Sequence, residues 1–199
     1  SKAKTFRHDL FTEYKANRQK MPEELAEQLS PLYDILNKMN IPLVSLDGYE
    51  ADDLIGTIAK EAESDNFETY IMTGDKDMMQ LVSDRVFVYS PGNRFKPTTT
   101  YTSEKVIDKW GVSPKQFIDY LAMVGDSSDN VPGVPGIGIK TAAELINKYK
   151  NLENLLDKAS EIPQNKRRET LLSNKEKAFI SKKLVTLKND VPIKNDPNE

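Results

Sequence analysis

The fold is decided by residues 51–90, which read ADDLIGTIAKEAESDNFETYIMTGDKDMMQLVSDRVFVYS. Residues 51–64 predict a helix, because apolar side chains recur at helical spacing on the face formed by Leu54, Ile55, Ile58, Ala59 and Ala62. Strands are expected at residues 67–73 and 86–90, with a short helix at residues 76–82 between them. This alternation of strand and helix predicts an α/β fold with a mostly parallel sheet.

Upstream of this stretch we expect one more helix and one more strand. A helix from Pro22 to about Met39 is indicated by leucines at helical spacing, and Pro31 should kink or divide it. Residues 41–46 predict a short strand that ends at Asp47-Gly48.

Downstream of about residue 100 the pattern becomes all-helical. Thr102 or Ser103 can cap a helix that ends at Gly111, and a capping box at Ser113 should open another that runs to Gly125. Further helices are expected at residues 140–149, from residue 151, near residue 165 and from residue 174. We therefore expect an α/β part over residues 1–100 and a helical part over residues 101–199.

Three short acidic clusters punctuate the chain: Gly48-Tyr49-Glu50-Ala51-Asp52-Asp53, Thr73-Gly74-Asp75-Lys76-Asp77 and Gly125-Asp126-Ser127-Ser128-Asp129-Asn130. Singly, each has an ordinary explanation as a first helical turn that complements the helix dipole, or as a solvated turn. Together they could supply oxygen ligands for two divalent ions, which can activate water and stabilise the leaving oxygen in phosphodiester cleavage.

A glycine-rich stretch follows the third cluster: Val131-Pro132-Gly133-Val134-Pro135-Gly136-Ile137-Gly138-Ile139-Lys140-Thr141-Ala142. A Gly-x-Gly turn that opens a helix exposes backbone N–H groups able to hold a phosphate oxygen. The stretch resembles a helix–hairpin–helix element, which binds DNA backbone without sequence preference. The alternative is a glycine-rich connector between two helices.

Composition narrows the chemistry further. The chain has no cysteine and one histidine, so disulfides and thiolate metal sites are excluded and a zinc site or a Ser-His-Asp triad is disfavoured. Carboxylate ligands favour Mg²⁺ or Mn²⁺. The net charge is −3, yet residues 1–20 carry six basic side chains against two acidic ones. A basic surface around an acidic pocket suits a nuclease, although a mixed-charge surface is the ordinary alternative. We expect no membrane span and a cytoplasmic, bacterial protein.

The order of GYEADD, TGDKD, GDSSDN and PGVPGIGIKTA resembles the 5′-nuclease domain of bacterial DNA polymerase I, which is related to flap endonucleases. The segment TFRHDLFTEYKANR is similar to the segment that leads into that family's helical arch. The likeness runs over nearly the whole chain, to about residue 192. It implies a PIN-like, resolvase-like 5′-nuclease fold with a helix–hairpin–helix in the helical part.

The resemblance also implies roles for individual residues. It assigns the metals, two Mg²⁺ or Mn²⁺ ions, to Glu50, Asp52, Asp53, Asp75, Asp77, Asp126 and Asp129. It assigns contact with the reacting phosphate, and thus a catalytic role, to Tyr14, Lys15 and Arg18 in the segment that leads into the arch. Contact with DNA falls on Arg7, Lys15, Arg18, Gly133, Gly136, Gly138, Lys140 and Thr141, and the hairpin could hold a K⁺ through its carbonyls.

The expected function is that of a metal-dependent 5′-3′ exonuclease and flap endonuclease, acting on flapped, nicked or branched DNA in replication and repair, including removal of Okazaki primers. A covalently linked polymerase domain is the expected partner. The family carries two further acidic ligands upstream of the segment that matches Ser1 onward, so we expect this chain to bind branched DNA but to cleave it poorly or not at all. Two alternatives stay open: a DNA-binding module with structural acids, and a phosphatase with an aspartyl nucleophile at Asp75-x-Asp77.

Overall fold

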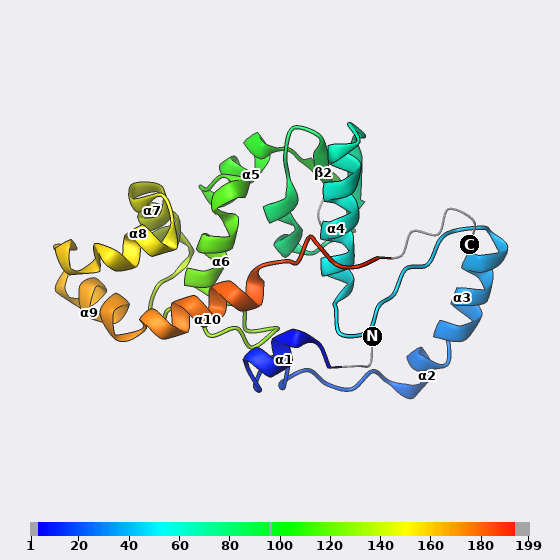
Figure 1. Cartoon of the computed structure of the whole chain (residues 1–199), viewed down its shortest axis with the longest axis horizontal. Coiled ribbons are helices and arrows are strands. Elements are labelled where there is room, and N and C mark those ends of the chain that lie inside the picture. The colour runs from blue at the N-terminus through cyan, green and yellow to red at the C-terminus, as the bar shows by residue number, and fades with distance from the viewer. Residues whose placement is uncertain (1–3, 96, 194–199) are drawn as a thin grey trace.

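The stretch 51–90 forms the centre of the molecule in the computed structural model, which describes residues 4–95 and 97–193 (Figure 1). The predicted helix is confirmed as α4, Ala51–Ser64, and the two predicted strands as β1, Thr69–Met72, and β2, Val86–Ser90. The short helix between the strands is η1, Lys76–Leu81, which is a 3₁₀ rather than an α-helix. Its first turn is tightened by the Asp75 carboxylate, which accepts a bond from the Asp77 amide.

The sheet is small and has the order β1-β2-β3. β1 runs parallel to β2, with Thr69 opposite Val86, and β2 runs antiparallel to β3, Thr99–Tyr101. The sequence did not indicate β3, because three residues are too few for an alternating pattern. α4 packs against β1 and buries Leu54 and Ala59 as expected, whereas Ile58, predicted to be buried, is exposed.

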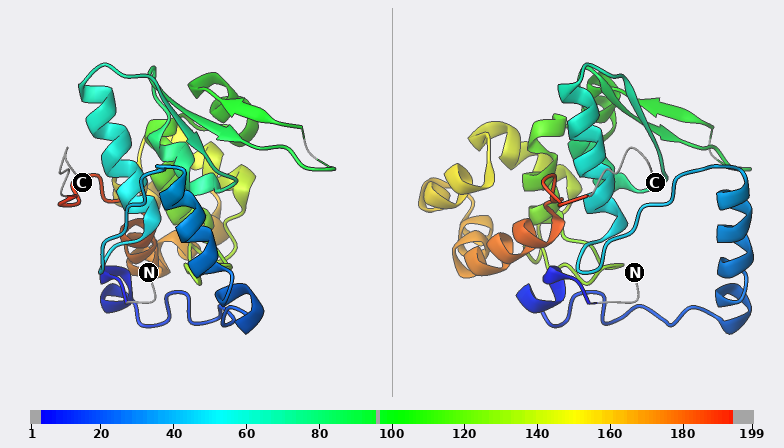
Figure 2. Two further views of the ribbon diagram at one scale, coloured as in Figure 1. Left: turned by 90° about the vertical axis from the view of Figure 1, so that its right-hand side faces the viewer. Right: turned by 45° about the vertical axis from the view of Figure 1, so that its right-hand side comes forward.

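The strand predicted at residues 41–46 is wrong. These residues are largely exposed and have no strand assignment, because the described strands β1, β2 and β3 pair only with one another. The helix predicted upstream is divided, as expected for a chain with Pro31, into α2, Glu23–Ala26, and α3, Leu29–Lys38. Both lie away from the sheet, at the end of long connecting segments (Figures 1 and 2).

The helical part follows the expected order. α5, Ser103–Trp110, is capped by Thr102 and ends at Gly111 in the left-handed conformation. The capping box at Ser113 opens η2, Pro114–Gln116, which continues into α6, Phe117–Val124. The remaining elements are α7, Ile139–Tyr149; α8, Leu152–Asp157; η3, Ala159–Glu161; α9, Asn165–Ser173; and α10, Lys175–Val185.

α6 lies at the centre of the core, where it packs against α10 and α7 and buries Phe117, Leu121 and Met123. After α10 the chain returns to α4, where the Val191 amide donates to Thr57 Oγ1 at 3.1 Å. α1, Phe6–Leu10, contacts α10 (Figure 1). The segment after α10 is thus joined to α4, and α1 to α10. No helix within residues 4–95 and 97–193 is long and apolar enough to cross a membrane.

Candidate active site

A cleft of about 480 Å³ opens where α4 begins, next to the end of β1. Five separate pieces of the chain line it: α1, the segment after α1, the start of α4, the turn after β1 and the loop after α6. The lining residues are Lys4, Thr5, His8, Lys15, Arg18, Tyr49, Glu50, Ala51, Asp52, Asp75 and Asp129. The cleft therefore brings together residues of all three acidic clusters and the two basic residues predicted to contact phosphate.

Local structure explains where each acid points. Glu50 is the N-cap of α4 and Asp52 lies in its first turn, where the helix dipole favours negative charge. Asp75 and Asp77 follow β1, at the carboxyl end of a parallel strand. The third loop is fixed by a bridge in which Asp126 and Val131 exchange backbone bonds of 3.0 and 2.7 Å.

Residues 13–18, which end the predicted segment 5–18 and are called the arch segment below, lie on this third loop. The Lys15 amide donates to the Asp129 carbonyl at 2.9 Å, and Asn17 Nδ2 donates to the Ser127 carbonyl at 2.7 Å. In return, Asn130 Nδ2 donates to the Glu13 carbonyl at 2.7 Å. The backbone of the arch segment is thus attached to the loop that carries two predicted metal ligands.

The basic side chains of the cleft are paired with its acids. Lys15 Nζ lies 2.7 Å from Glu50 Oε1 and 3.6 Å from Asp129 Oδ2, and Arg18 Nη2 is bonded to Asp129 Oδ1. Lys76 is bonded to Asp126 and lies 3.4 Å from Asp77 Oδ1. Lysine and arginine thus neutralise much of the negative charge that the three acidic clusters bring to this region.

Two carboxyls of the acidic clusters have raised pKa values, and burial is the main cause in both. Burial, followed by the nearby Asp75 and Glu50 charges, raises the pKa of Asp52 to about 6. Burial, with repulsion from Asp75 and Asp126, likewise raises the pKa of Asp77 to about 6, although Lys76 opposes it. A cation bound near such a carboxyl would stabilise its ionised form.

These residues fit hard divalent cations by their donor chemistry. The acids offer only oxygen ligands, and the buried Asp77 Oδ1 accepts no hydrogen bond. As positioned, however, no three acidic or histidine side chains within the described residues come close enough to hold an ion together. Lysine and arginine side chains are instead paired with Glu50, Asp129 and Asp126.

Asp53 and Arg7 are placed otherwise than predicted. Asp53 is fully buried and Arg7 is 1% exposed, and the guanidinium binds both carboxylate oxygens at 2.7 Å. Although burial opposes it, this partner lowers the pKa of Asp53, and backbone amides of Lys188 and Glu50 help. Neither side chain is free for a metal or for DNA, so both assignments are corrected to a buried, structural ion pair.

Tyr14 and Gly133 also differ from expectation. The Tyr14 ring is buried, and only its hydroxyl reaches the site, where it donates to Glu50 Oε2 at 3.2 Å. Burial and the Glu50 charge raise the pKa of this hydroxyl, so it stays protonated. Gly133 is buried against Gly125, and its amide donates to Ser181 Oγ, so it cannot reach DNA.

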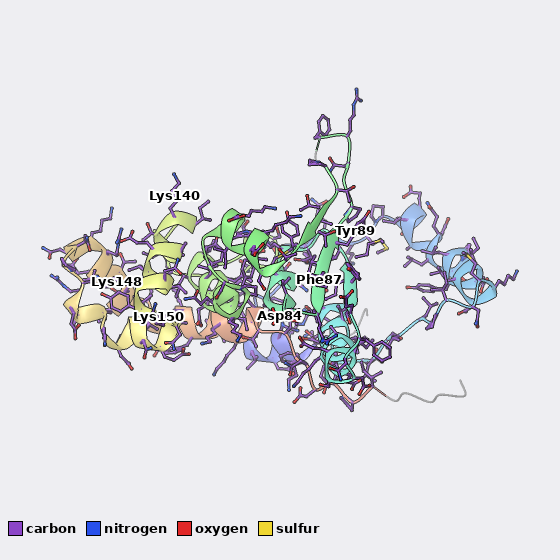
Figure 3. All side chains as sticks on the ribbon, turned by 90° about the horizontal axis from the view of Figure 1, so that it is seen from above. Asp84, Phe87, Tyr89, Lys140, Lys148 and Lys150 are labelled. Carbon is purple, nitrogen blue, oxygen red and sulfur yellow. The ribbon has the colours of Figure 1, made fainter. Side chains whose placement is uncertain are left out.

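The rest of the hairpin is open to a partner. A methyl group added at the α-carbon of Gly136 or Gly138 would meet no other atom within 4 Å. Lys140 is exposed at the start of α7 (Figure 3). Thr141 is half-buried in the first turn of the same helix. The surface around these four residues can therefore be approached closely.

The sequence did not single out five of the residues that line the cleft, Lys4, Thr5, His8, Tyr49 and Ala51, nor Lys76, which contacts two acids nearby. His8 lies within the quoted TFRHDL segment and Tyr49 within GYEADD, so their proximity to predicted ligands was the available signal. Lys76 lies between two predicted ligands in TGDKD, and only the structure shows which carboxylates it contacts.

The fold is that of the 5′-nucleases. The chain superposes on the 5′-exonuclease of bacteriophage T5 with bound divalent metal ions (zinc), with TM-score 0.78 and 29% identity over 92% of this chain and 70% of that one. It superposes equally on the T5 flap endonuclease in complex with DNA and metal ions, with TM-score 0.79 and 27% identity over the same shares.

The particular family is shown by sequence. The N-terminal resolvase-like domain of 5′-3′ exonucleases matches residues 1–111, and the C-terminal SAM fold of 5′-3′ exonucleases matches residues 112–199. The chain belongs to the 5′-3′ exonuclease family.

The names of similar curated proteins agree with this family assignment. The chain is 43% identical to the 5′-3′ exonuclease of Buchnera aphidicola subsp. Acyrthosiphon pisum, over 97% of this chain and 68% of that protein. It is 48% identical to DNA polymerase I of Rhizobium leguminosarum, over 98% of this chain and 19% of that protein. The chain thus spans about a fifth of the length of this polymerase.

Proposed function

We propose that this chain is a module of a nuclease that hydrolyses phosphodiester bonds of DNA with a 5′ flap, a nick or a branched end and that depends on divalent metal ions. The observation that carries the proposal is the cleft itself, in which acids from three distant segments meet Lys15 and Arg18. Acids alone would repel a phosphate, and lysine and arginine alone would only bind it, so the combination favours cleavage over binding.

The proposed metal ligands are Glu50, Asp52, Asp75, Asp77, Asp126 and Asp129. We take the ions to be Mg²⁺ or Mn²⁺, because all the donors are carboxylate oxygens. When bound, two such ions supply an activated water and stabilise the leaving oxygen of the phosphodiester.

The chain itself must position the phosphate. Lys15 and Arg18 are held at the mouth of the cleft by Glu50 and Asp129, and Arg18 is exposed. Cations that neutralise these acids would release both side chains for phosphate oxygens. The Tyr14 hydroxyl donates a hydrogen bond to Glu50, so the role of Tyr14 is to position a ligand rather than to touch the phosphate.

The hairpin is the proposed grip on duplex backbone away from the cleft. Gly136 and Gly138 leave room for close approach of a phosphate to their amides, and Lys140 and Thr141 follow at the start of α7. The resemblance to helix–hairpin–helix elements also favours a K⁺ bound by the hairpin carbonyls.

We further propose that the module is covalently linked to a polymerase domain and works in replication and repair in the bacterial cytoplasm, since relatives over nearly its whole length include bacterial DNA polymerase I proteins. The division into an α/β part to residue 100 and a helical part from residue 101 stays a proposal. The two family matches meet at residues 111 and 112.

The proposal is tested with a 5′-labelled flap substrate and with Mn²⁺ titration followed by electron paramagnetic resonance. Asp77→Asn should lose most Mn²⁺ binding, because it removes a ligand charge. The matched control is Asp84→Asn, which changes an exposed aspartate outside the cleft (Figure 3). The wild-type chain and the control should bind Mn²⁺ alike.

Cleavage separates the alternatives. Release of labelled products that requires Mn²⁺ and disappears with a chelator supports the nuclease. Salt-sensitive flap binding without Mn²⁺ binding would favour the DNA-binding module instead. Phosphate covalently attached to Asp75 after incubation with a phosphomonoester would favour the phosphatase.

A further inference from the structure

Lys76 occupies a position that neither the nuclease chemistry nor the DNA grip explains. It is the first residue of η1, between Asp75 and Asp77, so its backbone is fixed by the same tight turn that places both acids. Its ammonium group reaches across to the loop after α6 and bonds to Asp126, 50 residues away in sequence. Lys76 therefore connects the second acidic cluster to the third.

The contacts of Asp126 show what Lys76 competes for. Asp126 Oδ1 already accepts the Ser128 amide at 2.7 Å and the Asp129 amide at 3.4 Å. Asp126 Oδ2 is the oxygen that remains, and Lys76 binds it. A metal ion that used Asp126 without breaking the loop would have to take this same oxygen.

Asp77 presents the opposing carboxylate. Its Oδ1 lies 3.4 Å from Lys76 Nζ and accepts no hydrogen bond, although it is buried. One ammonium group thus stands between two carboxylates that would otherwise face each other unscreened. The Lys76 side chain is 41% exposed, whereas those of Asp77 and Asp126 are 19% and 14% exposed. The acids are fixed and the lysine has room to move outward.

We propose that Lys76 is a resident counterion of the metal site: it holds Asp77 and Asp126 facing one another before a divalent ion binds, and it gives up Asp126 Oδ2 when the ion arrives. Lysine suits this exchange, because it is a compact charge on a flexible stem that makes single rather than bidentate contacts. Lys76 is a positioning residue, and it sets the metal affinity by competition. The inference rests on the proposed function, since it requires Asp77 and Asp126 to be metal ligands.

The experiment compares Lys76→Met, which keeps the length and removes the charge, with Lys76→Arg, which keeps the charge in a more rigid group. Mn²⁺ dissociation constants are measured by electron paramagnetic resonance on the full 199-residue chain. Lys76→Met should bind Mn²⁺ about two- to fivefold more tightly, as expected for loss of a half-exposed ion pair. Lys76→Arg should bind it more weakly than wild type, because a guanidinium holds carboxylates more firmly.

A second readout follows the protein without metal. Lys76→Met should lower the melting temperature in chelator, because Asp77 and Asp126 then repel each other, and added Mn²⁺ should raise it by more than in wild type. Lys60→Met, at an exposed lysine of α4, is the matched control and should change neither quantity.

Equal Mn²⁺ affinity in wild type and both Lys76 variants would overturn the inference, as would weaker binding by Lys76→Met. If the wild-type chain binds no Mn²⁺ at Asp77, the proposed metal site itself has failed. The two failures are distinguished by the comparison of wild type with Asp77→Asn, which shows whether Mn²⁺ binds at Asp77.

Discussion

At the scale of single residues, the most consequential contact is the buried pair of Arg7 and Asp53. The guanidinium also donates to the Leu184 carbonyl at 2.7 Å and the Thr186 carbonyl at 2.9 Å. Asp53 Oδ1 and Oδ2 accept from the amides of Lys188 and Glu50. Every charged atom of the pair has a partner, which is what makes a buried ion pair tolerable. The pair ties α1 and the end of α10 to the turn that carries Glu50.

Arg7→Gln should lower the free energy of unfolding by about 3–5 kcal/mol, because it leaves the Asp53 charge buried without its partner. Urea unfolding measures the loss. Arg94→Gln, at an exposed arginine, is the control and should stay within about 0.5 kcal/mol of wild type. Adding Asp53→Asn to Arg7→Gln should cost less than Asp53→Asn alone, since the pair is already broken. A loss below about 1 kcal/mol in Arg7→Gln would show that the pair is not a structural link.

At the scale of elements, the site depends on a loop that receives another segment. The loop 126–130 has no regular helix or strand of its own, yet residues 13–18 are bonded to it through Lys15, Asn17 and Asn130. Asn130 adopts a left-handed backbone, with φ of 57°. It therefore shapes the loop through its backbone and holds the arch segment through its side chain.

Asn130→Gly should keep the loop, because glycine accepts the left-handed conformation, but lose the bond to the Glu13 carbonyl. Losing one such bond should raise the opening of residues 13–18 about two- to tenfold. Limited trypsin digestion after Lys15 and Arg18 measures this as faster cleavage. Asn66→Gly is the matched control, since Asn66 has φ of 64° at the end of α4, outside the site. Equal digestion of the two variants would mean that the Asn130 side chain does not hold the segment.

At the scale of the whole molecule, the acids of the cleft and the lysines of α7 lie in different places. Four acids line the cleft, whereas α7 carries Lys140 at its start and Lys148 in its last turn, with Lys150 just beyond (Figure 3). The residues from 139 to 183 carry eleven basic side chains against six acidic ones. A net charge of −3 therefore conceals a basic end suited to phosphate backbone.

Lys140→Gln should weaken binding of flapped duplex DNA alike for all sequences, because a phosphate contact carries no base information. The slope of log affinity against log salt should fall by about one, the contribution of one lost phosphate contact. Fluorescence anisotropy over a salt series measures both. Lys60→Gln on α4, which also removes one exposed charge, is the control and should keep the wild-type slope. The hairpin assignment is refuted by an unchanged slope in Lys140→Gln.

Local signals in the sequence determined most of the elements. The α4 helix, the capped start of α5, the Ser113 capping box and the α7 helix all rest on spacing and capping within a few residues of each other. The secondary-structure predictions were wrong or missing where pairing with a segment distant in sequence decides whether a strand forms. Residues 41–46 have the composition of a strand, but they pair with none of the described strands. β3 is a strand because it pairs with β2.

In the site, too, local sequence signals located some features and only distant partners decided others. The acid clusters, the arch segment and the hairpin could be located from the sequence because residue type and short spacing reveal them. Which acid faces the cleft could not, since Asp52 and Asp53 are neighbours on α4 and point to different surroundings. Only tertiary structure brings Arg7 to Asp53 and Lys76 to Asp126, because a buried charge is placed by the partner that neutralises it, and that partner comes from another part of the chain.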